Sequence, residues 1–193
     1  MGDFKVFDYM EKHRYEQVVH FYDPTTGLKG ITVIHNTLLG PALGGTRLWN
    51  YANEEDALID CLRLARGMSY KAAASGLNLG GGKTVLIGDA AKLKSEAYFR
   101  ALGRFVQSLN GRYSTAEDVN TSSRGMSYVA MGADHVVGLE GKSGNPAPVT
   151  ALGVFHGIKA GLMHKFGNAD IENCSFAVQG AGQVDVVLEA VVQ

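Results

Sequence analysis

Two lysines whose surroundings suit acid–base chemistry lie in residues 67–88, GMSYKAAASGLNLGGGKTVLIG. Lys71 and Lys83 flank a segment rich in glycine and small residues, which lets backbone and ligand approach each other closely. An ammonium that is desolvated in such a crevice beside a second cation has a lowered pKa, so it can act as a base near neutral pH. The segment therefore predicts a site. The alternative is that both lysines are ordinary surface charges beside a glycine turn.

The same segment does not predict a phosphate site. GGGKT (80–84) ends like a P-loop, but the pattern GxxxxGK[ST] requires glycine at position 77, which is Leu77. The glycines also lead into the apolar, β-branched residues 84–88, which predict a strand, whereas a P-loop opens a helix. Nucleoside triphosphate binding is therefore excluded at this segment.

A second group of candidate residues follows another predicted strand. Residues 112–115 predict the strand, and the polar segment TAEDVN (115–120) begins at its end. Ligands of open α/β sheets gather at the carboxyl ends of strands, so Glu117 and Asp118 are candidate site residues. The alternative is a helix N-cap cluster without chemistry.

The elements that must position these residues alternate between helix and strand. Asn53 predicts a helix N-cap, and apolar residues then recur at helical spacing up to Lys71, at the C-terminal end of the helix. Residues 84–88 predict the next strand and residues 95–109 the next helix. This alternation predicts an α/β protein whose N-terminal substrate domain has a central mixed sheet and flanking helices.

The segments before Asn53 predict a short helix or arm, a β-hairpin and a loop. Residues 1–15 predict a short helix or arm, and residues 17–22 and 28–35 predict a β-hairpin because turn residues separate two β-rich runs. LGPALGGTR (39–47) contains three glycines and one proline, so we expect a functional loop there, or alternatively a tight structural turn. Further on, residues 133–138 predict a weak strand.

A composition change in the last third indicates a domain boundary. Residues 141–150, GKSGNPAPVT, predict a linker between a first domain, 1–140, and a second, 151–193. A helix over 149–166, closed by a glycine, and an apolar strand over 174–179 follow.

That strand runs into Gly180-Ala181-Gly182, the opening of a dinucleotide-binding βαβ unit. The third glycine position is Asp185, whose side chain crowds the packing of helix on strand. The printed sequence stops at Gln193, before a second strand and before the acidic residue that binds the ribose. We therefore expect the truncated start of a Rossmann-like domain.

Composition and charge narrow the classes of partner. The 193 residues are 46% hydrophobic, enough for a substantial core, and the net charge of −1 indicates neither nucleic acid nor an acidic membrane as partner. The six histidines form no ligand-like cluster, so no metal site is predicted, and the distant Cys61 and Cys174 suggest reduced thiols. Without a leader or a long apolar run, we expect a cytoplasmic protein that binds a small neutral or zwitterionic ligand.

Five segments, in the same order, resemble the amino acid dehydrogenases of the leucine, valine and phenylalanine type, relatives of glutamate dehydrogenase. The resemblance covers nearly the whole chain and corresponds to the N-terminal part of the family. The segments are LGPALGGTR (39–47), RLARGMSYKAAASGLNLGGGKT (63–84), NGRYSTAEDV (110–119), SGNPAPVTALGV (143–154) and VQGAG (178–182).

The resemblance implies an activity and an assembly. Family members reversibly deaminate an L-amino acid to the 2-oxo acid and ammonia with NAD as oxidant, and they form homo-oligomers through the N-terminal domain. Their chains continue through a complete nicotinamide domain, so the sequence as printed is not expected to turn over by itself. The alternative is a non-catalytic substrate-domain remnant that self-associates.

The resemblance also implies roles for individual residues. Lys71 is expected to hold the substrate carboxylate, Lys83 to be the catalytic lysine that activates water or receives a proton, and Asp118 to exchange protons with the amine and iminium. Arg47 is expected to form a structural ion pair. Residues expected to bind the substrate besides Lys71 are Leu43, Gly44, Gly45, Met68 and Ala116. Residues expected to bind NAD are Thr150, Gly180, Ala181, Gly182, Gln183, Val184 and Asp185.

The same correspondence suggests a substrate preference. Leu43 and Ala116 match family positions that face the substrate side chain. An aliphatic wall opposite a small methyl group suits a branched-chain substrate better than an indole or a phenol. Leucine, valine or isoleucine is therefore favoured, with phenylalanine second.

Overall fold

The computed structural model describes residues 4–142, 144–180, 182 and 184. The chain divides into two compact units, Met1–Lys142 and Ser143–Gln193. The sequence-based domain limits, 1–140 and 151–193, remain a prediction.

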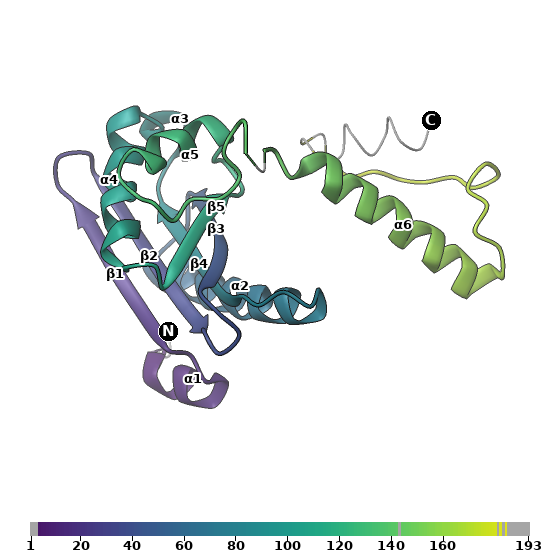
Figure 1. Cartoon of the computed structure of the whole chain (residues 1–193), viewed down its shortest axis with the longest axis horizontal. Helices are drawn as coiled ribbons and strands as arrows, with labels where there is room; N and C mark the ends of the chain where they lie inside the picture. Colours follow the sequence, from purple (N-terminus) through teal and green to yellow (C-terminus); the bar gives the residue numbers. More distant parts are fainter. Residues whose placement is uncertain (1–3, 143, 181, 183, 185–193) are drawn as a thin grey trace. The chain divides into compact units, whose positions relative to one another are not determined.

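The first unit is built on one five-stranded mixed sheet (Figure 1). Its strands are β1 (Gln17–Asp23), β2 (Leu28–Asn36), β3 (Ala42–Trp49), β4 (Gly80–Ile87) and β5 (Tyr113–Glu117). They lie in the order β1-β2-β4-β3-β5. The pairs β1–β2 and β2–β4 are antiparallel, and β3 is parallel to both β4 and β5. The predicted α/β class with a central mixed sheet is therefore confirmed.

Helices cover both faces of this sheet (Figure 1). The long α2 (Glu54–Ala74) packs on one face, while α4 (Glu96–Ser108) and α5 (Ser123–Ala130) cover the other. The short helices α1 (Val6–His13) and α3 (Ala90–Leu93) lie before β1 and after β4 in the chain. Each face has its own apolar core because successive strand side chains point to opposite sides. On β4, for example, Val85 packs with the α2 cluster and Leu86 with the α4–α5 cluster.

Local sequence signals explain the two long helices of this unit. The Asn53 side chain accepts a hydrogen bond from the Asp56 amide, and the Ser95 side chain accepts one from the Tyr98 amide. These N-caps satisfy amides that have no partner within the helix. The predicted starts of both helices are thus confirmed.

One predicted loop is wrong: most of residues 39–47 belong to β3. Glycine is normally depleted in strands, which is why the sequence indicated a loop. Here the glycines allow the close fit of the central strands. A Cβ atom on Gly44 would collide with the carbonyl oxygen of Gly82, and one on Gly81 with the amide and hydroxyl of Ser69. The depletion of glycine in strands also explains why the sequence predicted a strand only over 84–88, whereas β4 begins at Gly80.

The predicted strand 133–138 is also wrong. In the structure this segment contributes a single bridge between Thr115 and Val136, and α5 precedes it. The helix α5 begins behind Ser122, whose side chain accepts a hydrogen bond from the Gly125 amide. Residues 133–138 follow β5 for too short a distance to add a sixth strand.

Buried hydroxyl pairs join the strands on the α4–α5 face. Thr32 and Thr84 are joined by a 2.8 Å hydrogen bond between their hydroxyls, and Thr46 and Thr115 by one of 2.7 Å. The Tyr113 hydroxyl donates to the Gly44 carbonyl at 2.6 Å. These contacts satisfy polar groups that would otherwise be costly to bury.

The second unit contains α6 (Ala147–Phe166), which starts two residues before its predicted beginning. Gly167 ends the helix with φ +72°, a left-handed conformation that suits glycine. The strand expected over 174–179 is wrong, because these residues have no regular structure and no described strand pairs with them. A strand requires a neighbour to satisfy its backbone groups. Among the described helices of both units, none is long and apolar enough to cross a bilayer.

Candidate active site

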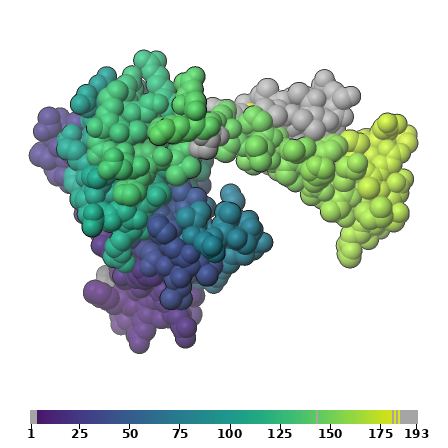
Figure 2. Space-filling view, viewed as in Figure 1, coloured from purple at the N-terminus to yellow at the C-terminus, as the bar shows by residue number. Residues whose placement is uncertain are grey.

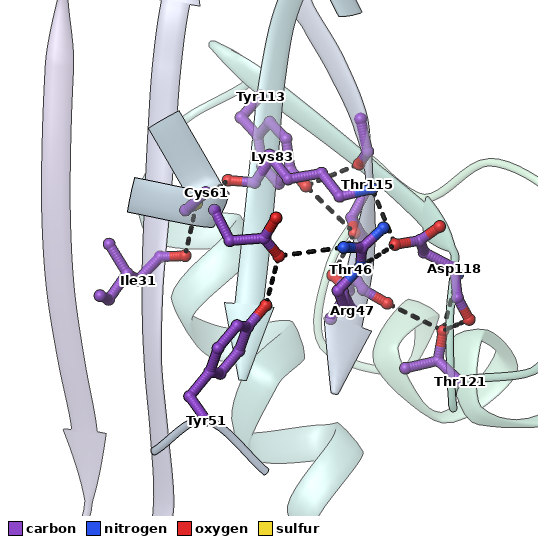
Figure 3. A network of polar contacts seen from close by, with 12 residues as sticks. Ile31, Thr46, Arg47, Tyr51, Cys61, Lys83, Tyr113, Thr115, Asp118 and Thr121 are labelled. Atoms are coloured by element: carbon purple, nitrogen blue, oxygen red, sulfur yellow. Dashed lines mark hydrogen bonds and ion pairs between the residues drawn. The ribbon is translucent and has the colours of Figure 1, made fainter. Parts of the chain in front are cut away.

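Lys83 is a buried ammonium with a carboxylate partner. It lies on β4 and is only 5% exposed. Its Nζ atom is 2.9 Å from Oδ2 of Asp118. Figure 3 shows this ion pair as a dashed line. A buried charge is costly unless it is paired and hydrogen-bonded, so this contact explains how the ammonium can remain inside the fold.

Asp118 directly follows β5, and its backbone is fixed by Thr121. The Asp118 amide donates to the Thr121 hydroxyl at 2.8 Å, and that hydroxyl donates to the carbonyl of Thr46 at 2.9 Å. Oδ2 of Asp118 accepts a second hydrogen bond, from Nε of Arg47 at 3.0 Å. Burial raises the pKa of Asp118, but the cationic Lys83 and Arg47 outweigh it, so the pKa lies below its usual range. At neutral pH Asp118 is therefore a carboxylate.

The absence of a side chain at Gly45 lets the end of β5 and Asp118 approach β3 closely. The strand β3 lies between β4 and β5, so the lysine side chain has to pass over β3. Gly45 pairs with Ala116 of β5 at this crossing. A Cβ atom on Gly45 would lie 2.6 Å from the Glu117 carbonyl oxygen and 2.9 Å from Cβ of Asp118. The glycine therefore allows Asp118 to lie close against β3, on the face from which Lys83 reaches it.

The α2 side of β3 and β5 is partly exposed beside this pair. Along β3 every second residue is partly exposed, including Leu43, Gly45 and Arg47. Ala116 and Asp118 are partly exposed on the neighbouring strand end. By strand alternation these residues share the face on which Lys83 starts. They form a shallow floor beside the Lys83–Asp118 pair.

Among the described residues, Lys71 forms no ion pair with Asp118. It is exposed near the C-terminal end of α2, which protrudes from the first unit in Figure 2. Within the described part of the chain it makes no ion pair. Met68, one turn earlier, is partly buried. The cation nearest to Lys83 in the contact network is Arg47, through Asp118, and not Lys71.

The structure adds residues that sequence reasoning missed. Nη1 of Arg47 donates to Oδ2 of Asp60 at 3.0 Å, and the Tyr51 hydroxyl donates to the same oxygen at 2.6 Å. Burial, and then the bond to Asp60, raise the pKa of Tyr51. A depression of about 390 Å³ is lined by these three residues with Trp49 and Val119. The only sequence signal was the position of Asp60, a carboxylate beside the buried Cys61 on α2.

The remaining predicted substrate residues lie on the central strands. Leu43 pairs with Gly81 on one side and Ser114 on the other. The Gly44 carbonyl is occupied by the Tyr113 hydroxyl. Gly44 therefore contributes close strand packing, while Leu43 is one of the partly exposed residues of the floor.

The residues predicted to bind NAD belong to the second unit. The Thr150 hydroxyl donates to the Pro146 carbonyl at 2.9 Å in the first turn of α6. Gly180 has φ +119°, and Gly182 and Val184 are described, whereas Ala181, Gln183 and Asp185 lie outside the described residues. Residues 174–179 do not form the strand that precedes a nucleotide-binding turn, and the NAD-binding roles of these seven residues remain a prediction. The described residues contain no group of three His, Cys, Asp or Glu side chains able to hold a metal ion.

Comparison with known proteins identifies the family. Residues 15–135 match the model of the Glu/Leu/Phe/Val dehydrogenase dimerisation domain. The chain is 58% identical over 183 residues to leucine dehydrogenase of Thermoactinomyces intermedius (93% of this chain, 50% of the relative) and 46% identical over 187 residues to phenylalanine dehydrogenase of Bacillus thermotolerans (95% and 48%). The crystal structure of L-tryptophan dehydrogenase from Nostoc punctiforme aligns with a TM-score of 0.72 and 41% identity (95% and 52%). The chain thus spans about half the length of these relatives, and it belongs to the Glu/Leu/Phe/Val dehydrogenase family.

Proposed function

We propose that this chain is the substrate-binding part of an NAD-dependent dehydrogenase that reversibly deaminates a branched-chain L-amino acid to the 2-oxo acid and ammonia. The observation that carries the proposal is the buried Lys83–Asp118 pair beside a partly exposed, glycine-containing floor. The higher identity to a leucine dehydrogenase than to a phenylalanine dehydrogenase supports an aliphatic substrate. The proposal includes a homo-oligomer, because the matching family model describes a dimerisation domain.

In this proposal the first unit performs the proton transfers. Asp118, a carboxylate at neutral pH, takes a proton from the substrate ammonium and releases it to solvent. After oxidation of the substrate to the iminium, a water molecule activated by Lys83 adds to the iminium carbon and gives a proton to the Asp118 carboxylate. Asp118 passes this proton to the leaving nitrogen and takes the hydroxyl proton as the C–N bond breaks, so that ammonia and the 2-oxo acid are formed. The 2.9 Å contact lets a proton pass between the two side chains.

The other expected residues bind the substrate. The exposed Lys71 ammonium, which has no ion pair among the described residues, is available for the substrate carboxylate. Leu43 and Ala116 are proposed to contact the aliphatic side chain, since both lie on the partly exposed face. NAD would supply the hydride acceptor for such a reaction.

A chimera tests the proposal. Residues 1–150 are joined to the nicotinamide half of the Thermoactinomyces intermedius leucine dehydrogenase, and NADH formation is followed with leucine, valine, isoleucine and phenylalanine. We expect turnover with a preference for the branched-chain substrates, and none from the 193-residue chain alone. A folded chimera without activity would favour the non-catalytic alternative. A preference for phenylalanine would contradict the assigned roles of Leu43 and Ala116.

A further inference from the structure

Arg47 contacts both carboxylates of the site through different edges of its guanidinium group. Nε donates to Asp118 at 3.0 Å (Figure 3). Nη1 donates to Asp60 at 3.0 Å. A guanidinium is planar and presents its donors in a fixed fork, whereas a lysine ammonium is a point charge on a flexible stem. Of the two cationic side chains, only arginine can therefore contact Asp118 and Asp60 through two fixed donors. These contacts hold β3, α2 and the end of β5 in fixed relative positions.

The contacts of Asp118 are concentrated on one oxygen. Both Lys83 and Arg47 bind Oδ2, at 2.9 and 3.0 Å. Among the described residues, no side chain or amide donates to Oδ1. The two cations thus fix the plane of the carboxylate and leave the other oxygen available. Asp118 is about one quarter exposed, so a small molecule can reach it.

The outer carboxylate keeps Arg47 in this orientation. Asp60 lies on α2, and its Oδ2 also accepts the Tyr51 hydroxyl at 2.6 Å. The four charged groups alternate in sign in the order Lys83, Asp118, Arg47, Asp60, so each cation lies between or beside anions. Partial burial strengthens such a network compared with an exposed surface pair.

We propose that Arg47 is a positioning residue that, held by Asp60 and Tyr51, orients the Asp118 carboxylate so that Oδ2 stays paired with Lys83 and Oδ1 faces the substrate amine. This inference rests on the proposed function, because it assigns Asp118 a substrate to act on. It replaces the expectation that Arg47 forms an ion pair with a structural role alone.

The contact between Arg47 and Asp118 can be tested by a titration that does not require enzymatic turnover. The 193-residue chain is labelled with ¹³C at its aspartate carboxyl groups, and each signal is titrated by NMR, with Asp118→Asn identifying the signal of interest. Arg47→Met is expected to raise the titration midpoint of Asp118, because it removes a cation from Oδ2. Arg112→Met is the matched control, since Arg112 pairs with Glu16 elsewhere on the unit and is expected to leave the Asp118 signal unchanged. An unchanged midpoint in Arg47→Met would overturn the inference.

The chimera tests the positioning role. Arg47→Lys keeps a positive charge but not the two-edged contact. We expect it to lower kcat by about 10²-fold, the loss associated with a displacement of about 1 Å, while KM changes by less than about threefold. Tyr51→Phe, a milder change behind Arg47, is expected to lower kcat by a smaller factor. A native kcat in Arg47→Lys would overturn the inference. If the parent chimera is inactive while the NMR shift is present, the proposed function fails and the orientation of Asp118 by Arg47 stands.

Discussion

At the scale of single residues, the chemistry of this site depends on a division between a buried and an exposed lysine. Lys83 is enclosed and paired, so its position is fixed before a substrate arrives. Lys71 is exposed and has no ion pair among the described residues, so it can pair with an incoming carboxylate. Fixed groups serve reaction steps that need orientation, and accessible charges serve capture.

This division predicts different kinetic defects for the two lysines in the chimera. Lys83→Ala removes a proton-transfer group and should lower kcat by roughly 10²–10⁴-fold. Lys71→Ala removes carboxylate binding and should mainly raise KM. Steady-state assays with leucine distinguish the two, with Lys29→Ala on the exposed side of β2 as control. Native activity in both variants would leave these roles unsupported.

The sequence predicted part of this site, for identifiable reasons. Lys83 was found from its glycine neighbours and Asp118 from its place after a strand, both of which are local signals. The link between Arg47 and Asp118 joins residues 71 positions apart, and that between Arg47 and Asp60 joins residues 13 apart. Such contacts depend on the register of β3 in the sheet, and β3 itself was predicted as a loop. The orientation of the carboxylate was therefore not predictable.

At the scale of elements, the packing of α4 contains one unfavourable group. Tyr98 is fully buried, and its hydroxyl has no hydrogen-bond partner among the described residues. Burial raises the pKa of this phenol, so the hydroxyl is neutral. A buried hydroxyl without a partner costs free energy, because it gives up its bonds to water.

Tyr98→Phe should therefore stabilise the protein by about 1 kcal/mol. The matched change is Tyr113→Phe, which deletes the hydrogen bond to Gly44 and should destabilise it by about 1 kcal/mol. Urea denaturation of the 193-residue chain measures both. A loss of stability in Tyr98→Phe as large as that in Tyr113→Phe would show that the Tyr98 hydroxyl is satisfied.

A histidine links β2, α2 and the end of α1. Nε2 of His35 donates to the His13 carbonyl at 3.1 Å, which leaves Nδ1 of the neutral ring to accept from the Ser69 hydroxyl at 2.8 Å. The rings of Tyr15 and Tyr70 pack around it. Burial lowers the pKa of His35, and the nearby Arg66 adds to this effect, while the bond to His13 opposes it.

The lowered pKa predicts a pH dependence of stability. The unfolded chain binds a proton at His35 more readily than the folded chain does, so this contribution is complete above pH 6.5 and is lost as the pH falls below it. The contribution of Asp118, whose pKa is also lowered, is lost only below about pH 4.

Between pH 7 and pH 5, melting temperatures of His35→Gln should fall less steeply than those of the native chain. His20→Gln, on the exposed side of β1, should keep the native slope. An equal slope in His35→Gln would contradict this assignment.

Helices and strands differed in how far the sequence could specify them. The caps Asn53 and Ser95 are local, and both helices begin where these residues indicate. The strand β3 is specified by its neighbours, because Gly44 and Gly45 fit only against β4 and β5. The segment 174–179 shows the opposite case, since an apolar, β-rich sequence without a paired neighbour remains irregular.

At the scale of the whole molecule, the first unit has surface features that favour association with further copies of the chain. The edge strand β1 pairs only with β2 within the described sheet, and the aromatic side chains of Tyr22, Trp49 and Phe7 are at least half exposed. Unpaired strand edges and exposed apolar side chains favour association.

We therefore expect the 193-residue chain to self-associate. Sedimentation velocity over a range of concentrations should show a dimer or a larger species, in agreement with the dimerisation named in the family model. Association should not depend on the site, so Asp118→Asn is expected to sediment like the native chain. A monomer at the highest concentration would contradict this expectation.

The position of β3 between β4 and β5 also sets an order of events during synthesis. Thr46 pairs with Thr84 on one side and Glu117 on the other, so both partners of the strand are made after it. A nascent chain therefore carries β3 with both edges unpaired until Thr84 has left the ribosome, and with one edge unpaired until Glu117 has. Unpaired apolar strands aggregate readily, whereas glycine weakens strand formation. Gly44 and Gly45, which allow β3 to fit closely against β4 and β5 in the finished sheet, thus also make premature pairing of the incomplete chain with other chains less favourable.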